Sequence, residues 1–254
     1  MRVPLAGGTQ ETLLSEVGPV LLRFFSTAEA CALRLVCHEF LAAVREHPWE
    51  DRDTVILGAI GAWRACFPRA RCANVQHRYQ SLRAARNATV RNEDFVHFEG
   101  LRELYMAHCW AVTDAAFVHL RGIRSLDMGW CDQAGITDAA FAHLAGIQRL
   151  SIHGCNQATI TDAAFAHLRG IKLLNMRGCS QLTDAAFAHL RGIHTLVMED
   201  CDQATITGSS FASLRGLSLL AMAKCSGAAV AAAQRLGLPV LTALGRVGNF
   251  TLVS

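Results

Sequence analysis

Apolar and polar residues follow one pattern that recurs over most of the chain from about residue 95 to residue 236. Each copy reads LxxLxLxxC, then a short turn, then TDAAFxHLxG. In the stretch SLDMG, Leu126 and Met128 alternate with polar residues, which predicts a short strand with one buried face. In the stretch TDAAFAHLRG, the apolar Ala164, Phe165 and Leu168 recur at helical spacing. Each copy therefore predicts one strand followed by one short helix.

The helical half also carries the signals that begin and end a helix. Thr161 is placed to cap the N-terminus, and Asp162 lies where the helix dipole favours negative charge. Arg169 stands at the last turn, and Gly170 follows as the C-terminal stop.

A cysteine marks the register of the copies, and neighbouring cysteines are 22 or 24 residues apart. The two-residue difference falls in the turn and leaves the register on both sides intact, so the turn is a loop. A period in this range with this leucine pattern is typical of a leucine-rich repeat. One strand and one short helix cannot bury an apolar face alone, so the copies must stack into an α/β solenoid. We expect buried structural thiols, not metal ligands, at Cys109, Cys131, Cys155, Cys179, Cys201 and Cys225.

The ends of the repeat region are less regular. Residues 95–101 match the helical half of a further copy, and its strand fits either Tyr79-x-x-Leu82-x-Ala84-x-x-Asn87 or Ala70-x-x-Ala73-x-Val75. At the other end, SGAAVAAAQRLGLPVLTAL predicts a degenerate last helix stopped by Gly237, then a capping strand. We assign residues 51–78 to a linker or N-terminal cap, 79–236 to the repeats and 237–254 to a C-terminal cap.

Residues 11–50 have no repeat character. EVGPVLLRFF, TAEACALRLVCHEF and AAVREHPW each place apolar residues at helical spacing, with Thr27 as a cap and Pro48 as the end of the third helix. Three short helices make a small independent core, so this all-α unit is expected to lean on a partner or on the solenoid.

This helical segment resembles an F-box. In LRLVCHEF, Val36-Cys37 is followed by Phe40 and then by Trp49, as in the second half of that domain. A helical segment of this kind before cysteine-containing leucine-rich repeats is similar to the F-box/leucine-rich-repeat family. The resemblance implies that the helices dock on a Skp-type adaptor of a cullin-type ubiquitin ligase, while the repeats hold a protein substrate. The adaptor-binding residues that it implies are Val20, Leu21, Phe25, Leu33, Val36 and Phe40.

Composition excludes several other classes of protein. The net charge of +3 is too small to indicate a nucleic-acid-binding protein by itself, and no apolar run approaches the ~20 residues that span a bilayer. The N-terminus has no basic segment followed by an apolar one, so we expect no signal peptide. Six of the ten cysteines recur at one repeat position and cannot all meet, which favours a reduced, intracellular protein, cytoplasmic or nuclear. We find no catalytic motif and expect neither an enzyme nor a cofactor.

Two groups of residues invite other interpretations. The histidine column at His97, His119, His143, His167 and His189 could bind a metal, but copying of the repeat explains it and no carboxylate or thiol stands at metal-site spacing. The aspartate column at Asp114, Asp138, Asp162 and Asp184 is explained by the helix N-termini. Six arginines between Arg69 and Arg91 could bind nucleic acid, but no aromatic ladder accompanies them.

The strand halves vary while the helical halves hardly do. Among the three copies that end at residues 147, 171 and 193, the helical half differs at two positions. Outward strand residues line the concave face that solenoids use for binding, although recent copying followed by chance is an alternative. We expect Trp130, Arg149 and Arg177 to anchor an acidic or phosphorylated protein partner, and Leu219, Ala221 and Ala223 to pack under the cap. The substrate-binding residues that we predict are Tyr105, Asp127, Trp130, Arg149, Ser151, His153, Asn175, Arg177 and Glu199. The alternative function is a free-standing interaction scaffold without a ligase role.

Overall fold

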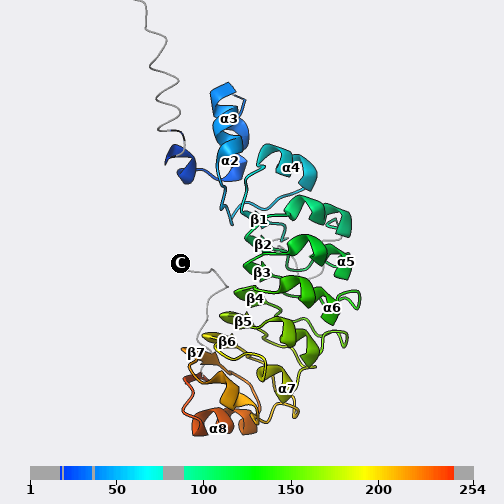
Figure 1. The fold of residues 1–254 in the computed structure, drawn as a ribbon, viewed down its shortest axis with the longest axis vertical. Helices are drawn as coiled ribbons and strands as arrows, with labels where there is room; N and C mark the ends of the chain where they lie inside the picture. Colours follow the sequence, from blue (N-terminus) through cyan, green and yellow to red (C-terminus); the bar gives the residue numbers. More distant parts are fainter. Residues whose placement is uncertain (1–17, 19, 36–37, 77–88, 243–254) are drawn as a thin grey trace, which may run out of the picture.

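The computed structural model describes residues 18, 20–35, 38–76 and 89–242. A single parallel sheet of eight strands, in chain order, forms the inner side of a curved solenoid (Figure 1). Its strands are β1 (Cys72–Asn74), β2 (Glu103–Tyr105), β3 (Ser125–Asp127), β4 (Arg149–Ser151), β5 (Leu173–Asn175), β6 (Thr195–Val197), β7 (Leu219–Ala221) and β8 (Val240–Leu241). The predicted α/β leucine-rich-repeat solenoid is therefore confirmed.

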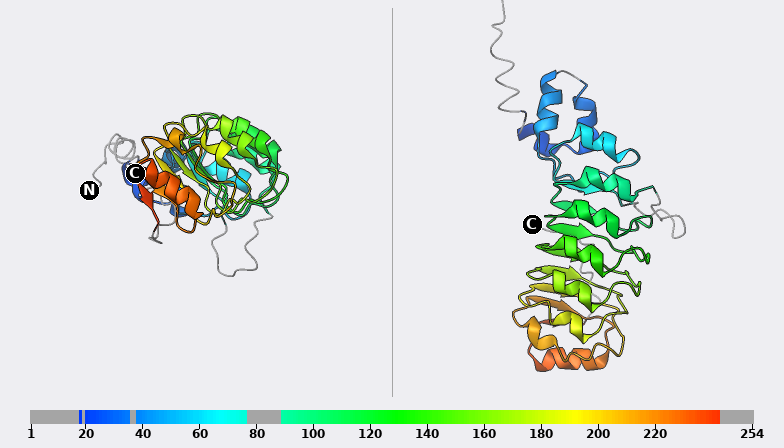
Figure 2. Two further views of the ribbon diagram at one scale, coloured as in Figure 1. Left: turned by 90° about the horizontal axis from the view of Figure 1, so that it is seen from below. Right: turned by 45° about the vertical axis from the view of Figure 1, so that its right-hand side comes forward.

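Short helices cover the outer side of the sheet, stacked one above another (Figure 2). Two of these helical halves form an α-turn followed by a 3₁₀ turn, three form a 3₁₀ helix alone and one forms an α-turn alone. The elements are η2 (Asn92–Phe98), α5 (Asp114–Phe117) with η3 (Val118–Leu120), α6 (Asp138–Phe141) with η4 (Ala142–Leu144), η5 (Asp162–His167), α7 (Asp184–Phe187) and η6 (Phe211–Leu214). Gly170 follows η5 with a φ of +84°, as its predicted role requires.

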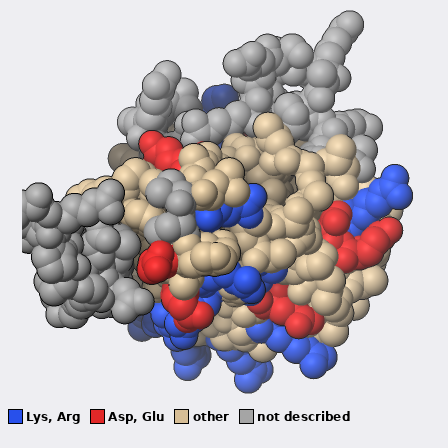
Figure 3. All heavy atoms as spheres, turned by 90° about the horizontal axis from the view of Figure 1, so that it is seen from above, with Lys and Arg blue, Asp and Glu red and all other residues tan. Residues whose placement is uncertain are grey.

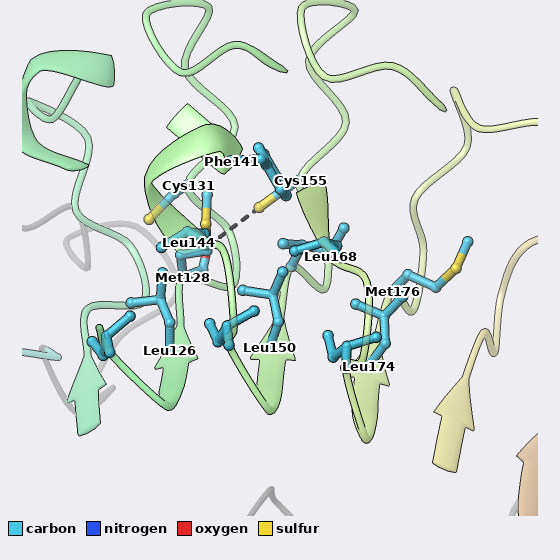
Figure 4. Close-up of a cluster of buried hydrophobic side chains, with 14 of the residues drawn as sticks. Leu126, Met128, Cys131, Phe141, Leu144, Leu150, Cys155, Leu168, Leu174 and Met176 are labelled. Atoms are coloured by element: carbon cyan, nitrogen blue, oxygen red, sulfur yellow. Dashed lines mark hydrogen bonds between the residues drawn. The ribbon is translucent and has the colours of Figure 1, made fainter. Parts of the chain in front are cut away.

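The alternating pattern places one leucine of each strand from β2 to β7 in the core. Leu126, Leu150 and Leu174 pair in register along the sheet and point inward between the strands and the helices (Figure 4). One phenylalanine of every helical half meets them from the other side. These rings, all buried, belong to Phe95, Phe117, Phe141, Phe165, Phe187 and Phe211.

The cysteines lie behind the strands and are bonded between repeats. Each thiol from Cys131 to Cys225 lies within hydrogen-bonding distance of a carbonyl of the preceding repeat, as Cys155 does with Met128 at 3.2 Å. Burial raises the pKa of Cys155 to about 12. Cys225 is the exception to the predicted burial, because it is partly exposed, and burial raises its pKa only to about 11. The remaining members of the column are fully buried.

The aspartate column also joins neighbouring repeats. The carboxylate of Asp138 accepts hydrogen bonds from the backbone nitrogen and the hydroxyl of Thr161, both at 2.7 Å. Asp114, Asp162 and Asp184 bind the equivalent threonines of the following repeats in the same way. Thr161 in turn caps its own helix through the nitrogen of Ala163. The Thr-Asp pair therefore begins one helix and fixes the next repeat.

The N-terminal helices are η1 (Leu22–Phe24), α2 (Thr27–Leu33) and α3 (His38–Glu46). The helix predicted over residues 27–40 ends earlier, at Leu33, and α3 begins four residues before the predicted third helix. The predicted cap at Thr27 is wrong, because Ser26 caps α2 in a capping box with Glu29. Ser and Thr are both good caps, so sequence alone does not separate two neighbours.

This helical unit packs on the solenoid and shares its core. Leu22, Val44 and Trp49 belong to the same buried cluster as the repeat leucines. The carboxylate of Asp51 accepts hydrogen bonds from the nitrogen and hydroxyl of Thr27, at the start of α2. A further helix, α4 (Ile60–Cys66), covers the first strand and packs against η2.

The two ends of the sheet settle the open strand assignments. β1 forms at the second candidate position, within Ala70–Val75, whereas the candidate from Tyr79 to Asn87 lies outside the described residues. At the other end, α8 (Gly227–Arg235) is followed by Gly237 with a φ of +67° and then by β8, as predicted. In the described part of the chain, no helix is long and apolar enough to cross a membrane.

Candidate protein-binding face

The concave face consists of the outward residues of the strands and of the residues just after them. Three residues lie between each strand from β2 to β7 and its cysteine, and the first of the three is buried. The third has a positive φ in His108, Trp130, Gly154, Gly178, Asp200 and Lys224. Seen from above, at the N-terminal end of the solenoid, basic and acidic side chains lie interspersed (Figure 3). The concave face also carries both signs of charge, since Arg149 pairs with Glu103 and Arg177 pairs with Glu199, so it is not a charged patch of one sign.

The first group of charges centres on Glu103. Its carboxylate lies 2.8 Å from Nε of Arg52 and 3.2 Å from Nη2 of Arg149. The hydroxyl of Tyr105 lies 3.3 Å from the same carboxylate. Burial raises the pKa of Tyr105, and the neighbouring Glu103 carboxylate raises it further. The predicted anchor Arg149 is therefore already paired within the chain.

A second group centres on Arg177, near the C-terminal end. Its guanidinium lies 3.3 Å from Glu199 and 2.8 Å from Asp200, and Asp200 also binds Lys224 at 3.2 Å. Burial would raise the pKa of Asp200, but its hydrogen bonds to Arg177 and Lys224 hold it below the usual value. Glu199 itself is almost fully buried.

Asp127 lies between these two groups. It accepts hydrogen bonds from Nε2 of Gln76 and from the nitrogen of Gly129, both at 3.1 Å. The Nδ1 of His153 is 3.9 Å from Asp127 and 2.8 Å from the hydroxyl of Ser151. Asp127 is one of the predicted site residues, and these contacts bring it together with two others, Ser151 and His153.

The rings of His108, Trp130 and His153 gather beside Asp127. Trp130 is parallel to His108, with ring centroids 6.2 Å apart, and perpendicular to His153, with centroids 6.1 Å apart. Trp130 remains 46% exposed, whereas Ser151 and Asn175 are almost fully covered. Toward the C-terminus, Ala221 and Ala223 are fully buried on this side.

Five of the six predicted adaptor-binding residues are described, and they lie in the helical unit at the N-terminal end. Val20, Leu21 and Phe25 are exposed, whereas Leu33 and Phe40 are partly buried, and Leu33 packs against the core. Val36 lies outside the described residues. A groove of about 810 Å³ opens between η1 and residues 47–53.

The histidine column and the arginine segment show no common site. His119 pairs with Glu99 at 2.6 Å, and Nε of Arg121 reaches His143 at 3.4 Å, so these histidines interact with neighbouring side chains one at a time. Among the described residues, no group of three or more His, Cys, Asp or Glu side chains could hold a metal ion. Of the arginine segment, Arg78, Arg83 and Arg86 lie outside the described residues.

Sequence reasoning missed several residues of the concave face and of the helical unit. Arg52 and Gln76 precede the recognisable repeats, so no periodicity placed them on the concave face. Glu103 and His108 do stand at outward repeat positions, and the register could have found them. The exposed Phe24 and Leu35 were missed because helical spacing alone does not tell which apolar residues a small unit leaves uncovered.

No family model and no curated protein matches this sequence. Among solved structures, the chain is similar to TLR13 from a complex with ssRNA13, with 15% identity and a TM-score of 0.53 over 76% of this chain and 28% of that one. Rad7 from the yeast Rad7–Elc1 complex gives 19% identity and 0.47 over 61% and 44%, and human 5T4 gives 16% and 0.41 over 68% and 73%. The chain thus spans less than half the length of the first two. Together with the eight-stranded parallel sheet, the likeness to TLR13 shows that the chain has the α/β leucine-rich-repeat solenoid fold.

Proposed function

We propose that this protein is an interaction scaffold that recruits a substrate to a cullin-type ubiquitin ligase. The N-terminal helical unit docks on a Skp-type adaptor, and the concave face of the solenoid holds the protein that is to be modified. The scaffold part of the proposal follows from the fold, and the ligase part extends the F-box resemblance of residues 11–50.

The gathering of exposed apolar side chains on the helical unit carries the proposal. Ten large apolar residues are exposed in the described part of the chain, and five of them are Val20, Leu21, Phe24, Phe25 and Leu35. Phe24 is 81% and Leu35 80% exposed. Exposed apolar clusters on soluble proteins mark interaction sites, because covering each such side chain releases about 1.5–3 kcal/mol. An apolar partner surface of the kind a Skp-type adaptor offers would cover them.

The concave face supports the second half of the proposal. Solenoids bind extended partners on this side, and here it offers ion pairs, hydroxyls and an exposed tryptophan across adjacent strands. Trp and Arg dominate the energetics of protein interfaces, and both occur at this face.

Capture of a purified Skp-type adaptor by the full chain tests the ligase part. A double variant, Leu21→Glu with Phe24→Glu, should abolish capture, because it places two charges on the docking surface. Both side chains are exposed, so the variant should keep the thermal stability of the wild type. The matched control is Leu57→Glu with Val118→Glu, which changes two exposed apolar residues elsewhere, 78% and 41% exposed, and should bind normally. Failure of the wild type to bind the adaptor would reject the ligase role.

A free-standing scaffold is the second candidate, and the shared core favours it. Trp49 of the N-terminal segment is fully buried, and its Nε1 donates to the carbonyl of Val44 at 2.8 Å. Arg69 binds Glu46 at the end of α3. The carbonyl of Trp49 also accepts hydrogen bonds from the nitrogens of Arg71 and Cys72, at the start of β1, so the helical unit caps the first strand. If it is only a cap, deleting residues 1–46 will destabilise the solenoid, and the wild type will bind substrate without any adaptor.

A further inference from the structure

Two glycines make room for two rings on the concave face. A Cβ atom on Gly129 would lie 1.9 Å from Cε1 of His153, and one on Gly154 would lie 2.6 Å from Cδ2 of Trp130. Each ring therefore lies directly against the backbone of a neighbouring repeat. The positions of both rings depend on residues in the adjacent repeat that have no side chain.

The rings of His153 and Trp130 lie beside the carboxylate of Asp127. His153 lies between Asp127 and Trp130, because its Nδ1 is 3.9 Å from the Asp127 carboxylate and its ring meets the indole edge to face. The Asp127 side chain is 18% exposed and Trp130 is 46% exposed, so both present surface to solvent. A side chain that crosses His153 would contact both.

Asp127 differs from the other acids of the face in its partners. Glu103 binds Arg52 and Arg149, and Asp200 binds Arg177 and Lys224. Among the described residues, no Lys or Arg contacts Asp127, which accepts only from an amide side chain and a backbone nitrogen and has His153 nearby. Burial lowers the pKa of His153 and outweighs the Asp127 carboxylate, which would raise it, and Arg177 lowers it further; a neutral imidazole is therefore favoured at pH 7 and brings no positive charge to Asp127.

We propose that Asp127 and Trp130 bind a basic side chain, lysine or arginine, of the protein that occupies the concave face. A carboxylate beside an exposed indole suits a cation, because the charge pairs with the carboxylate and the aliphatic stem or cationic head packs on the ring. The proposal rests on the concave-face binding proposed above and specifies its chemistry. It concerns a different part of the face from the acidic partner expected at Arg149 and Arg177, two arginines that have carboxylate partners in the chain.

Short capped peptides test the site directly on the full-length protein. Four probes share one uncharged glycine-serine frame and carry a central lysine, arginine, norleucine or glutamate. Norleucine keeps the length and the apolar stem of lysine and lacks the ammonium group. Binding is followed by NMR through the indole Nε1–H signal of Trp130, which the variant Trp130→Phe identifies among the four tryptophans.

The lysine and arginine peptides should shift this signal in a saturable way at millimolar concentration, and the norleucine and glutamate peptides should bind several-fold more weakly. Asp127→Asn should weaken the lysine peptide by about fivefold or more. Glu93→Gln, which removes one exposed acid on the helical side, is the matched control and should leave affinity unchanged.

Equal binding of lysine and norleucine, unchanged affinity in Asp127→Asn, tighter binding of glutamate, or no binding of any probe would each overturn the proposal. None of these results bears on capture of the adaptor, which takes place at the helical unit. The peptide experiment can therefore reject the proposed basic side chain without rejecting the ligase role, and the adaptor experiment can reject the ligase role without rejecting the basic side chain.

Discussion

Gly154 and Gly178 occupy equivalent positions in neighbouring repeats and form a natural matched pair. Their φ values are +70° and +68°, so an alanine meets the same backbone strain at either position. They differ in what covers them. A Cβ atom on Gly178 meets nothing within 4 Å, whereas one on Gly154 would overlap the indole of Trp130.

The expected costs follow from this difference. Gly178→Ala should destabilise the protein by about 1 kcal/mol. A non-glycine residue is strained in the left-handed conformation of the folded state, and this cost is partly offset because alanine lowers the conformational entropy of the unfolded chain. Gly154→Ala carries the same strain and also displaces the Trp130 ring, which loses its contacts with His108 and with the backbone. An aromatic pair contributes about 0.5–1.5 kcal/mol beyond area burial, so we expect a total of about 1.5–2.5 kcal/mol.

Urea unfolding of both variants, alone and combined with Trp130→Ala, measures the difference. In the Trp130→Ala background the two glycine substitutions should lower the free energy of unfolding by the same amount, because no indole remains for the new Cβ atom to overlap. The indole signal of Trp130 should move in Gly154→Ala and stay in place in Gly178→Ala. Equal costs of the two substitutions in the wild-type background would show that Trp130 does not lie on Gly154.

Three further predictions concern the contacts between neighbouring repeats. Asp138→Ala should destabilise the protein by about 1–3 kcal/mol in thermal unfolding, because it removes both bonds to Thr161, and Asp138→Asn, which keeps an acceptor, should cost less. Under native maleimide labelling followed by peptide mapping, Cys225 should react before Cys155, since it is partly exposed; the reverse order would contradict the register. Burial alone would raise the pKa of Asp184, but hydrogen bonds from the following repeat lower it, so its contribution should be complete above pH about 4 and lost as pH falls further. Asp184→Asn should therefore flatten the acid limb of the stability curve, and an unchanged limb would argue against these bonds.

The repeats could be predicted from the sequence because strand alternation and helix termination each depend on residues within one copy. Leu126 and Met128 alternate since a strand turns successive side chains to opposite faces, and Gly170 ends its helix since only glycine adopts a φ of +84° without strain. These causes act within one copy, so reading one copy was enough to place the strand, the helix and the core.

The binding face depends on contacts between segments that no period connects. Arg52 reaches Glu103 from a segment 51 residues earlier, so Arg149 shares the Glu103 carboxylate with a second cation. The position of Trp130 depends on the absence of a side chain at Gly154, in the next repeat. Outward position can be predicted from the sequence, whereas charge pairing and ring orientation need the three-dimensional arrangement.

The contacts between repeats also explain why the strand halves of the copies vary while the helical halves hardly do. The TDAAF half supplies the threonine cap, the aspartate that holds the next repeat and the buried phenylalanine, so a change there weakens two repeats at once. Outward strand residues do not hold the repeats together in this way, because the strands are hydrogen-bonded through the backbone and packed through the inward leucines. Variation on the concave face is therefore permitted by the fold and is not by itself a sign of binding. What distinguishes the region around Asp127 is more specific: a carboxylate with no cationic partner among the described residues, beside an exposed indole that a glycine keeps in place.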